Sequence, residues 1–286
     1  LLERRLVLVT GKGGVGKSTL AAALALIAAR AGKRVVVCEV GGPSAVAPLL
    51  GGAEAPAAHP PRPIGEGVHL AVLGAEDGIR RYLADRIPIP GVVDLVFQQQ
   101  AVSRFFRAAP AFAEMGILYA ISRLLEERDA SGEPRWDHVI VDLPASGHAV
   151  GMLEAPFVGK RIFLAGPVRA LCDSIERMLV DHDLASAVVV TLPEELPVNE
   201  AMELSERLRA RGLRVDAVLA NAVEAASIDE GERALLEKLQ EERRHPLLQA
   251  ALDAERRAAR GSAILRRLEA GIRGALVPIS WRIERG

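Results

Sequence analysis

Short, unbroken apolar runs alternate along the chain with longer segments of helical character. The apolar runs lie at residues 6–10, 34–39, 69–73, 138–142, 187–191, 215–220 and 275–279. Runs of this kind are typical of strands that are buried on both faces of a parallel sheet. Helical segments are expected at 18–30, 170–180, 198–211 and 229–273, with interrupted helical periodicity over 75–128. This order predicts one doubly wound α/β domain over residues 1–286, a mostly parallel sheet flanked by helices.

Two segments depart from this alternation. Residues 41–67 are rich in proline and glycine, so an irregular loop is expected there. Residues 75–128 are predicted to form a small helical cap, a subdomain within the larger one. It carries four phenylalanines, which we interpret as core; a client-binding groove is the less favoured alternative. They are Phe97, Phe105, Phe106 and Phe112.

Composition narrows the functional classes. The 286 residues carry a net charge of −1, which does not favour nucleic-acid binding. Two cysteines cannot build a disulfide framework, so a reducing cytoplasm is expected. The apolar run at 18–31 is shorter than the roughly 20 residues that span a bilayer, and it follows a strand and a glycine-rich turn. We therefore expect a soluble protein without stable membrane insertion.

A phosphate-binding motif lies between the first strand and the first helix. Residues 11–18, GKGGVGKS, fit G-x-x-x-x-G-K-[ST], whose glycines let backbone amides converge on an anion at a helix N-terminus. Lys17 is predicted to reach the β- and γ-phosphates and Ser18 to bind Mg²⁺. Asp142 ends the strand at 138–142, where such sites place a second magnesium ligand. The predicted nucleotide-binding residues of this loop are Gly11, Lys12, Gly13, Gly14, Val15, Gly16, Lys17, Ser18 and Thr19.

Lys12 adds a second cation to this loop. The string KGGVGKST at 12–19 resembles the deviant Walker A motif of the MinD, ParA and ArsA class. That resemblance implies ATP as the nucleotide, and a dimer in which Lys12 reaches the partner's phosphates in trans. The dimer could be homomeric or formed with a paralogue.

Further stretches resemble the ArsA-like family of arsenite-pump and tail-anchored-protein targeting ATPases. DLPASGH at 142–148 is similar to its switch II, which makes Pro144, Gly147 and His148 switch residues. VTLPEELPV at 190–198 and ANAV at 220–223 resemble two more of its motifs, and the second implies that Asn221 contacts adenine. Pro278 is also assigned to nucleotide binding. The similarity runs from residue 6 to about residue 279.

The chain also departs from this family. The family follows its second strand with acidic residues that orient the attacking water, whereas Gly41 and Pro48 stand at those positions here. Only Glu39 remains as a candidate catalytic acid beside Lys12 and Lys17, so slow turnover is expected. The Cys-x-x-Cys zinc pair of the eukaryotic branch is absent, as in a short bacterial-type member.

Three functions follow from these patterns. The leading hypothesis is a Mg²⁺-dependent ATPase that acts as a nucleotide-gated dimeric switch for a partner or client protein. The second is an ATP-gated scaffold with negligible hydrolysis, paired with an active paralogue. The third is a positioning ATPase of the MinD or ParA kind, which the neutral charge and the short C-terminal segment disfavour.

Overall fold

The computed structural model describes residues 2–52, 60–87, 89, 91–98, 110–225 and 228–280. Its centre is an eight-stranded sheet in the order β3-β4-β2-β5-β1-β6-β7-β8, parallel except for the β3–β4 pair. The mostly parallel, doubly wound architecture is therefore confirmed. The strands are β1 (Leu6–Gly11), β2 (Val35–Val40), β3 (Arg62–Gly65), β4 (Val68–Leu73), β5 (His138–Asp142), β6 (Ala185–Thr191), β7 (Val215–Val223) and β8 (Ala275–Ser280).

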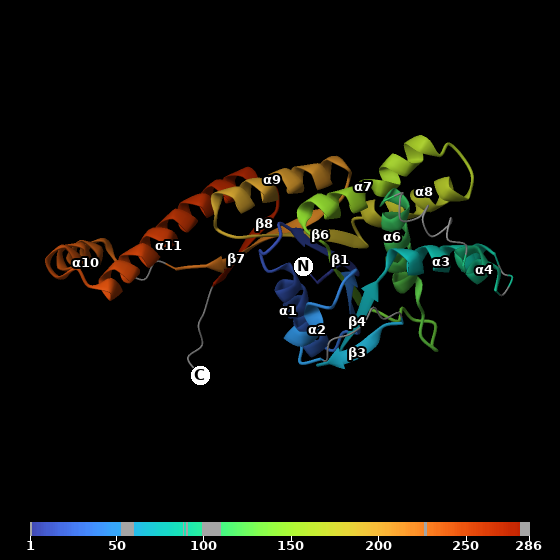
Figure 1. Ribbon diagram of the computed structural model, residues 1–286, viewed down its shortest axis with the longest axis horizontal. Coiled ribbons are helices and arrows are strands. Elements are labelled where there is room, and N and C mark those ends of the chain that lie inside the picture. The colour runs from blue at the N-terminus through green and yellow to red at the C-terminus, as the bar shows by residue number, and fades with distance from the viewer. Residues whose placement is uncertain are drawn as a thin grey trace.

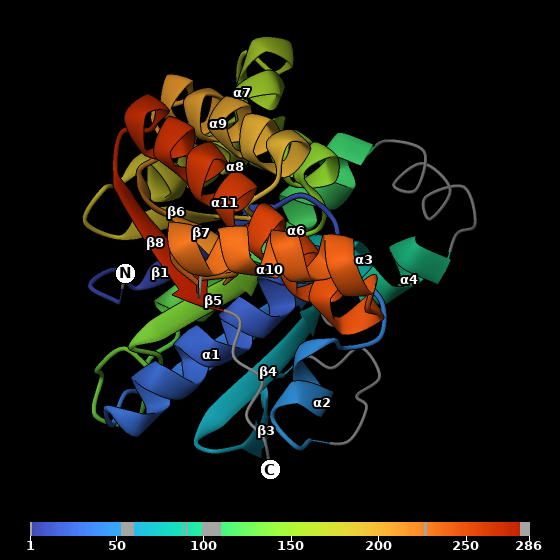
Figure 2. The same cartoon turned by 90° about the vertical axis from the view of Figure 1, so that its left-hand side faces the viewer.

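Helices cover both faces of this sheet (Figures 1 and 2). On one face lie α1 (Lys17–Arg30) and the short α2 (Val46–Leu49). On the other lie α6 (Pro110–Glu126), α7 (Ser146–Ile162), α8 (Pro167–Val180) and α9 (Glu195–Ala210). The remaining helices are α3 (Ala75–Arg86) and α4 (Val92–Gln98), which follow β4, and α10 (Glu230–Arg243) and α11 (Pro246–Gly271), which precede β8.

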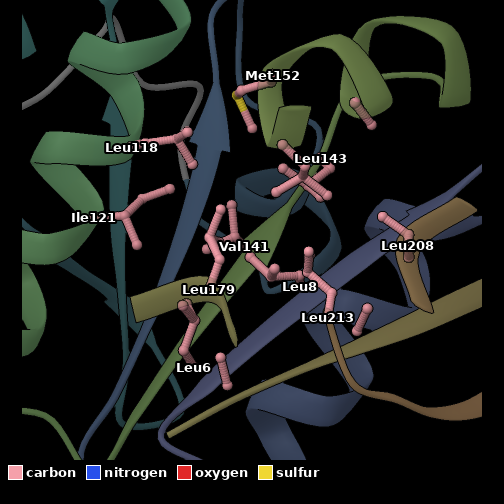
Figure 3. Close-up of a cluster of buried hydrophobic side chains, with 14 of the residues drawn as sticks. Leu6, Leu8, Leu118, Ile121, Val141, Leu143, Met152, Leu179, Leu208 and Leu213 are labelled. Carbon is pink, nitrogen blue, oxygen red and sulfur yellow. The ribbon is translucent and has the colours of Figure 1, made fainter. Parts of the chain in front are cut away.

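Alternation along β1 divides the buried side chains between two hydrophobic cores. Leu6 and Leu8 point into the core under α6–α9, whereas Val7 and Val9 point into the core under α1. Figure 3 shows the first core, where leucines of β1 meet side chains of α6, α7 and α8. Because β1 is buried on both faces, its carboxyl end and the loop that follows are fixed in place.

The segment at 75–128 contains helices, as its periodicity predicts. α3 packs against α6, and α6 packs on β5. Phe97 is buried beneath the guanidinium of Arg80, whose Cζ lies 4.4 Å from the ring centroid, and Phe112 packs edge-on against Phe163. Phe105 and Phe106 lie outside the described residues.

One local prediction is wrong, and one helix was not predicted. The proline-rich segment is not wholly irregular, since α2 and β3 form within it and β3 pairs with β4. Residues 146–162, for which the sequence pattern predicted no element, form α7 with Pro156 inside the helix. Burial of Ala149, Met152 and Leu153 against the sheet offsets the low helix propensity of that stretch.

Candidate functional site

The loop at 12–16 leaves the central strand β1 at the carboxyl edge of the sheet. Gly14 and Gly16 have φ angles of 82° and 93°, values that glycine adopts without strain. A side chain at Gly16 would also collide with the amide group of Asn221. No described side chain caps α1, so its first backbone amides remain available to an anion.

Two lysines lie over this loop. The Lys17 ammonium donates a hydrogen bond to the Lys12 carbonyl oxygen at 3.0 Å. Burial lowers the pKa of Lys17, and the nearby Asp142 carboxylate opposes that shift. The Lys12 ammonium points elsewhere and lies 2.8 Å from Glu200 Oε1 on α9. Of the two lysines, Lys17 is therefore the one whose ammonium lies beside the loop in which an anion would bind.

Ser18 and Asp142 meet at the start of α1. The Ser18 hydroxyl donates to Asp142 Oδ2 at 2.5 Å, while the buried Oδ1 has no hydrogen-bond partner among the described residues. Burial raises the pKa of Asp142, and the charge of Glu39 acts in the same direction. A carboxylate oxygen beside a hydroxyl is the donor set that Mg²⁺ prefers, and the orphaned oxygen fits such an ion. The described residues contain no cluster of three or more His, Cys, Asp or Glu that could bind a metal, so most ligands would come from substrate and water.

Glu39 lies opposite Asp142 in the register of β2 and β5. Its carboxylate accepts hydrogen bonds from the Ser44 hydroxyl and from the backbone amides of Ala45 and Val46, the latter two at 2.8 and 3.1 Å. Glu39 is buried, with 6% of its surface exposed. In this arrangement the side chain anchors the N-terminal turn of α2.

Asn221 and Pro278 are placed differently. Asn221 Nδ2 donates to the Val15 carbonyl oxygen at 3.0 Å, which ties β7 to the phosphate loop. Pro278 lies opposite Ala220 on the edge strand β8, between Val277 and Ile279, which both pack on the α1 side. Since side chains alternate along a strand, the exposed Pro278 ring faces away from the α1 side of the sheet. The structure joins Asn221 to the loop and does not bring Pro278 to it.

The predicted switch II residues surround the start of α7. Pro144 is half-buried, while Gly147 and His148 are exposed. The His148 amide donates to the Ala145 carbonyl at 2.9 Å. Burial raises the pKa of Glu114 on α6, and the nearby His148 opposes that shift. A cavity of about 110 Å³ separates this end of α7 from α9, lined by Ser146, Gly147, Val150, Glu200, Glu203, Leu204 and Arg207.

The comparison with protein families gives the decisive match. The model of the anion-transporting ATPase family, ArsA-type, matches residues 4–165. The match spans 162 of the 286 residues, more than half of the chain. The chain belongs to this family. The matched part of the chain contains the phosphate loop, Glu39 and Asp142, and ends before Glu200, Asn221 and Pro278.

Individual relatives agree. ATPase BagA of Mycobacterium tuberculosis (strain ATCC 25618 / H37Rv) is 32% identical over 229 residues, which cover 76% of this chain and 64% of BagA. The arsenical pump-driving ATPase of Escherichia coli is 26% identical over 235 residues, 76% of this chain and 39% of that protein. The chain therefore spans less than two thirds of the length of these relatives. Among the described helices, none has the length and apolar character needed to cross a bilayer.

Sequence reasoning missed Glu200. Its partner Lys12 stands 188 positions earlier in the chain, and a glutamate on the polar face of a helix resembles any solvated residue. The only local hint is that α9 follows β6, a neighbour of β1, so the start of α9 lies at the same sheet edge as the phosphate loop.

Proposed function

We propose that this chain is a Mg²⁺-dependent ATPase that turns over slowly and acts as a nucleotide-gated dimeric switch for a partner or client protein. The observation that carries the proposal is the pairing of Ser18 with Asp142, whose second oxygen is buried without a described partner beside an uncapped helix N-terminus. Membership of the anion-transporting ATPase family supports it.

Each residue has a part in this proposal. The amides of residues 13–18 bind the phosphates, with the field of α1 adding to theirs. Lys17 exchanges the Lys12 carbonyl for phosphate oxygens. Ser18 and Asp142 hold Mg²⁺, which, when bound, neutralises negative charge on the phosphoryl oxygens. Asn221 ties β7 to the loop through Val15, and in this proposal it also contacts the base.

Lys12 carries the dimeric part of the proposal. Its ammonium is not directed at the phosphate loop, which supports a role outside its own subunit. A partner's Lys12 would stabilise the charge of the transferring phosphoryl group. Loops 41–52 and 142–151 would then respond to the γ-phosphate.

A specific observation favours a second candidate, the ATP-gated scaffold with negligible hydrolysis. The Glu39 carboxylate already accepts three hydrogen bonds within its own chain. A carboxylate engaged in this way is poorly placed to orient water, so binding without appreciable turnover would follow. The two buried cysteines, neither in a disulfide, are compatible with a cytoplasmic location for either candidate.

The experiment compares the parent with Lys17→Ala, Lys12→Ala and, as a matched control, Lys238→Ala on the distant helix α10. ATP affinity, turnover and oligomeric state are measured with Mg²⁺ present. Lys17→Ala should lose ATP binding, whereas Lys12→Ala should bind ATP, dimerise more weakly and lose turnover. Undiminished ATP binding by Lys17→Ala would contradict the phosphate site. ATP-dependent dimerisation without turnover in the parent would select the scaffold.

A further inference from the structure

The Lys12–Glu200 ion pair joins the phosphate loop to α9. The two charged groups lie 2.8 Å apart, and their side chains are 32% and 34% exposed. The pair is therefore accessible to solvent and to competing ions, yet short enough to fix the direction of the lysine. This contact directs the Lys12 ammonium away from the region where the phosphates would lie, whereas the Lys17 ammonium stays at the loop.

From this geometry we propose that Glu200 is a positioning residue that holds Lys12 on its own subunit and releases it when two nucleotide-loaded subunits associate. The inference rests on the proposed function, because the ammonium cannot bind Glu200 and a partner's phosphate at once. Glu200 thereby opposes dimerisation until a triphosphate is within reach.

Charge explains the exchange. One carboxylate offers a single negative charge, whereas the terminal phosphates of ATP present several charged oxygens that attract an ammonium more strongly. A flexible four-carbon stem lets the lysine swing between the two acceptors. Two such pairs break when a symmetric dimer forms. At the values typical of exposed ion pairs, losing both opposes dimerisation by about twofold to about thirtyfold in affinity.

Glu200 also contacts the region that would respond to nucleotide. It lines the cavity between α9 and the start of α7, together with Gly147, Glu203 and Arg207. Arg207 in turn lies 3.5 Å from Glu154 on α7. Departure of Lys12 leaves Glu200 unneutralised at this cavity, so the position of the lysine alters the electrostatic balance between α7 and α9.

The first test measures, without nucleotide, how strongly the ion pair with Glu200 protects Lys12 from acetylation. The chain has five lysines, so limited acetylation with a succinimidyl ester followed by peptide mass spectrometry gives a rate for each. The Lys12 rate, divided by the Lys238 rate in the same molecule, should rise threefold or more in Glu200→Gln. Glu203→Gln is the matched control, because Glu203 lines the same cavity without bonding to Lys12, and it should leave the ratio unchanged.

The second test reads dimerisation by sedimentation velocity with Mg²⁺ and a nonhydrolysable ATP analogue. Glu200→Gln should tighten the dimer by about twofold to about thirtyfold, and this gain should vanish in the Lys12→Ala background. A merely structural role for Glu200 would lower stability in both backgrounds and would not tighten the dimer.

The outcomes distinguish failure of the positioning role of Glu200 from failure of the proposed ATPase function. An unchanged Lys12 ratio in Glu200→Gln, or a dimer gain that persists without Lys12, overturns the positioning role while leaving the ATPase intact. If the parent binds no analogue, the proposed function fails, and a raised Lys12 ratio would still establish that Glu200 restrains the lysine. A parent that dimerises with the analogue while Glu200→Gln dimerises no more tightly also refutes the inference.

Discussion

The Asp142 carboxylate is suited to a cation and unfavourable without one. It is buried, one of its oxygens lacks a described partner, and Glu39 adds a second negative charge across the β2–β5 pair. We expect Asp142→Asn to stabilise the nucleotide-free protein and to weaken Mg²⁺-dependent nucleotide binding. Asparagine keeps an acceptor for Ser18 and removes the charge.

The magnitude follows from opposing effects. Exchanging a charged acceptor for a neutral one costs about 1 kcal/mol at the Ser18 bond. Removing the charge of a buried carboxylate, one of whose oxygens has no described partner, relieves several times that amount at most. We expect a net gain of about 1–2 kcal/mol, which raises Tm by roughly 2–8 °C in a domain of this size.

The pH dependence of stability independently predicts that Asp142→Asn stabilises the nucleotide-free protein. Burial raises the pKa of Asp142 above 3.8, so the folded protein binds this proton more tightly than the unfolded chain. The ionised carboxylate is then a penalty at neutral pH. That penalty diminishes as pH falls through the folded-state pKa and is absent below about pH 4, where both states are protonated. The stability difference between parent and Asp142→Asn should shrink in the same range.

Thermal denaturation with and without Mg²⁺ and ATP is the assay. A ligand at one hundred times its Kd stabilises by about 2.7 kcal/mol, roughly 5–10 °C here, and Asp142→Asn should lose most of that shift.

The control is Asp137→Asn just before β5, because the Arg34 hydrogen bonds lower the pKa of Asp137 to about 2. Asp137 thus stabilises the fold above pH 3.8 and loses that contribution as pH falls toward 2, so its replacement should cost up to about 1 kcal/mol at neutral pH. A lower Tm for nucleotide-free Asp142→Asn, or an undiminished Mg²⁺–ATP shift, would refute the reasoning.

Two further substitutions test other parts of the structure. Gly78→Ala should lower the free energy of unfolding in urea by about 2–4 kcal/mol, because the new methyl would collide with the Gly116 carbonyl where α3 crosses α6. Its control is Gly147→Ala, which should be close to neutral because no described atom lies within 4 Å of the new methyl. Glu39→Ala should lower stability by about 2–4 kcal/mol, because the Ser44 hydroxyl proton and two backbone amides lose their acceptor. A loss of kcat at unchanged Tm would instead indicate a water-orienting role.

The central strands and the phosphate loop could be predicted because their signals are local. Val7 and Leu8 belong to a run that is apolar on both faces, which only a strand between two layers of helices can bury. The loop after β1 needs glycine at Gly14 and Gly16 for its backbone, so the requirement is written in the sequence itself.

Helix α7 and strand β3 could not be predicted because their stability comes from distant partners. The α7 segment contains three glycines and Pro156, and its helix forms because Met152 and Leu153 are buried against the core under α6–α9. β3 consists of four residues from a proline-rich segment and exists through its pairing with β4. Neither contact has a signal within the segment that it orders.

In the candidate site, too, some positions could be predicted from the sequence and others could not, and strand geometry explains the difference. The predicted nucleotide-binding residues include Asn221, which was assigned through motif resemblance, and Pro278. Which face a side chain takes depends on strand register, and the residue type on an edge strand does not fix it. On β7, Asn221 reaches the loop beside α1, whereas Pro278 on β8 is exposed and faces away from the α1 side of the sheet. If a base binds beside Asn221, then Pro278 acts on it at most through the β7–β8 backbone pairing. A change such as Pro278→Ala should therefore leave ATP affinity nearly unaltered, while Asn221→Ala should weaken it by releasing Val15, and equilibrium binding of a fluorescent ATP analogue to both variants would decide between these positions.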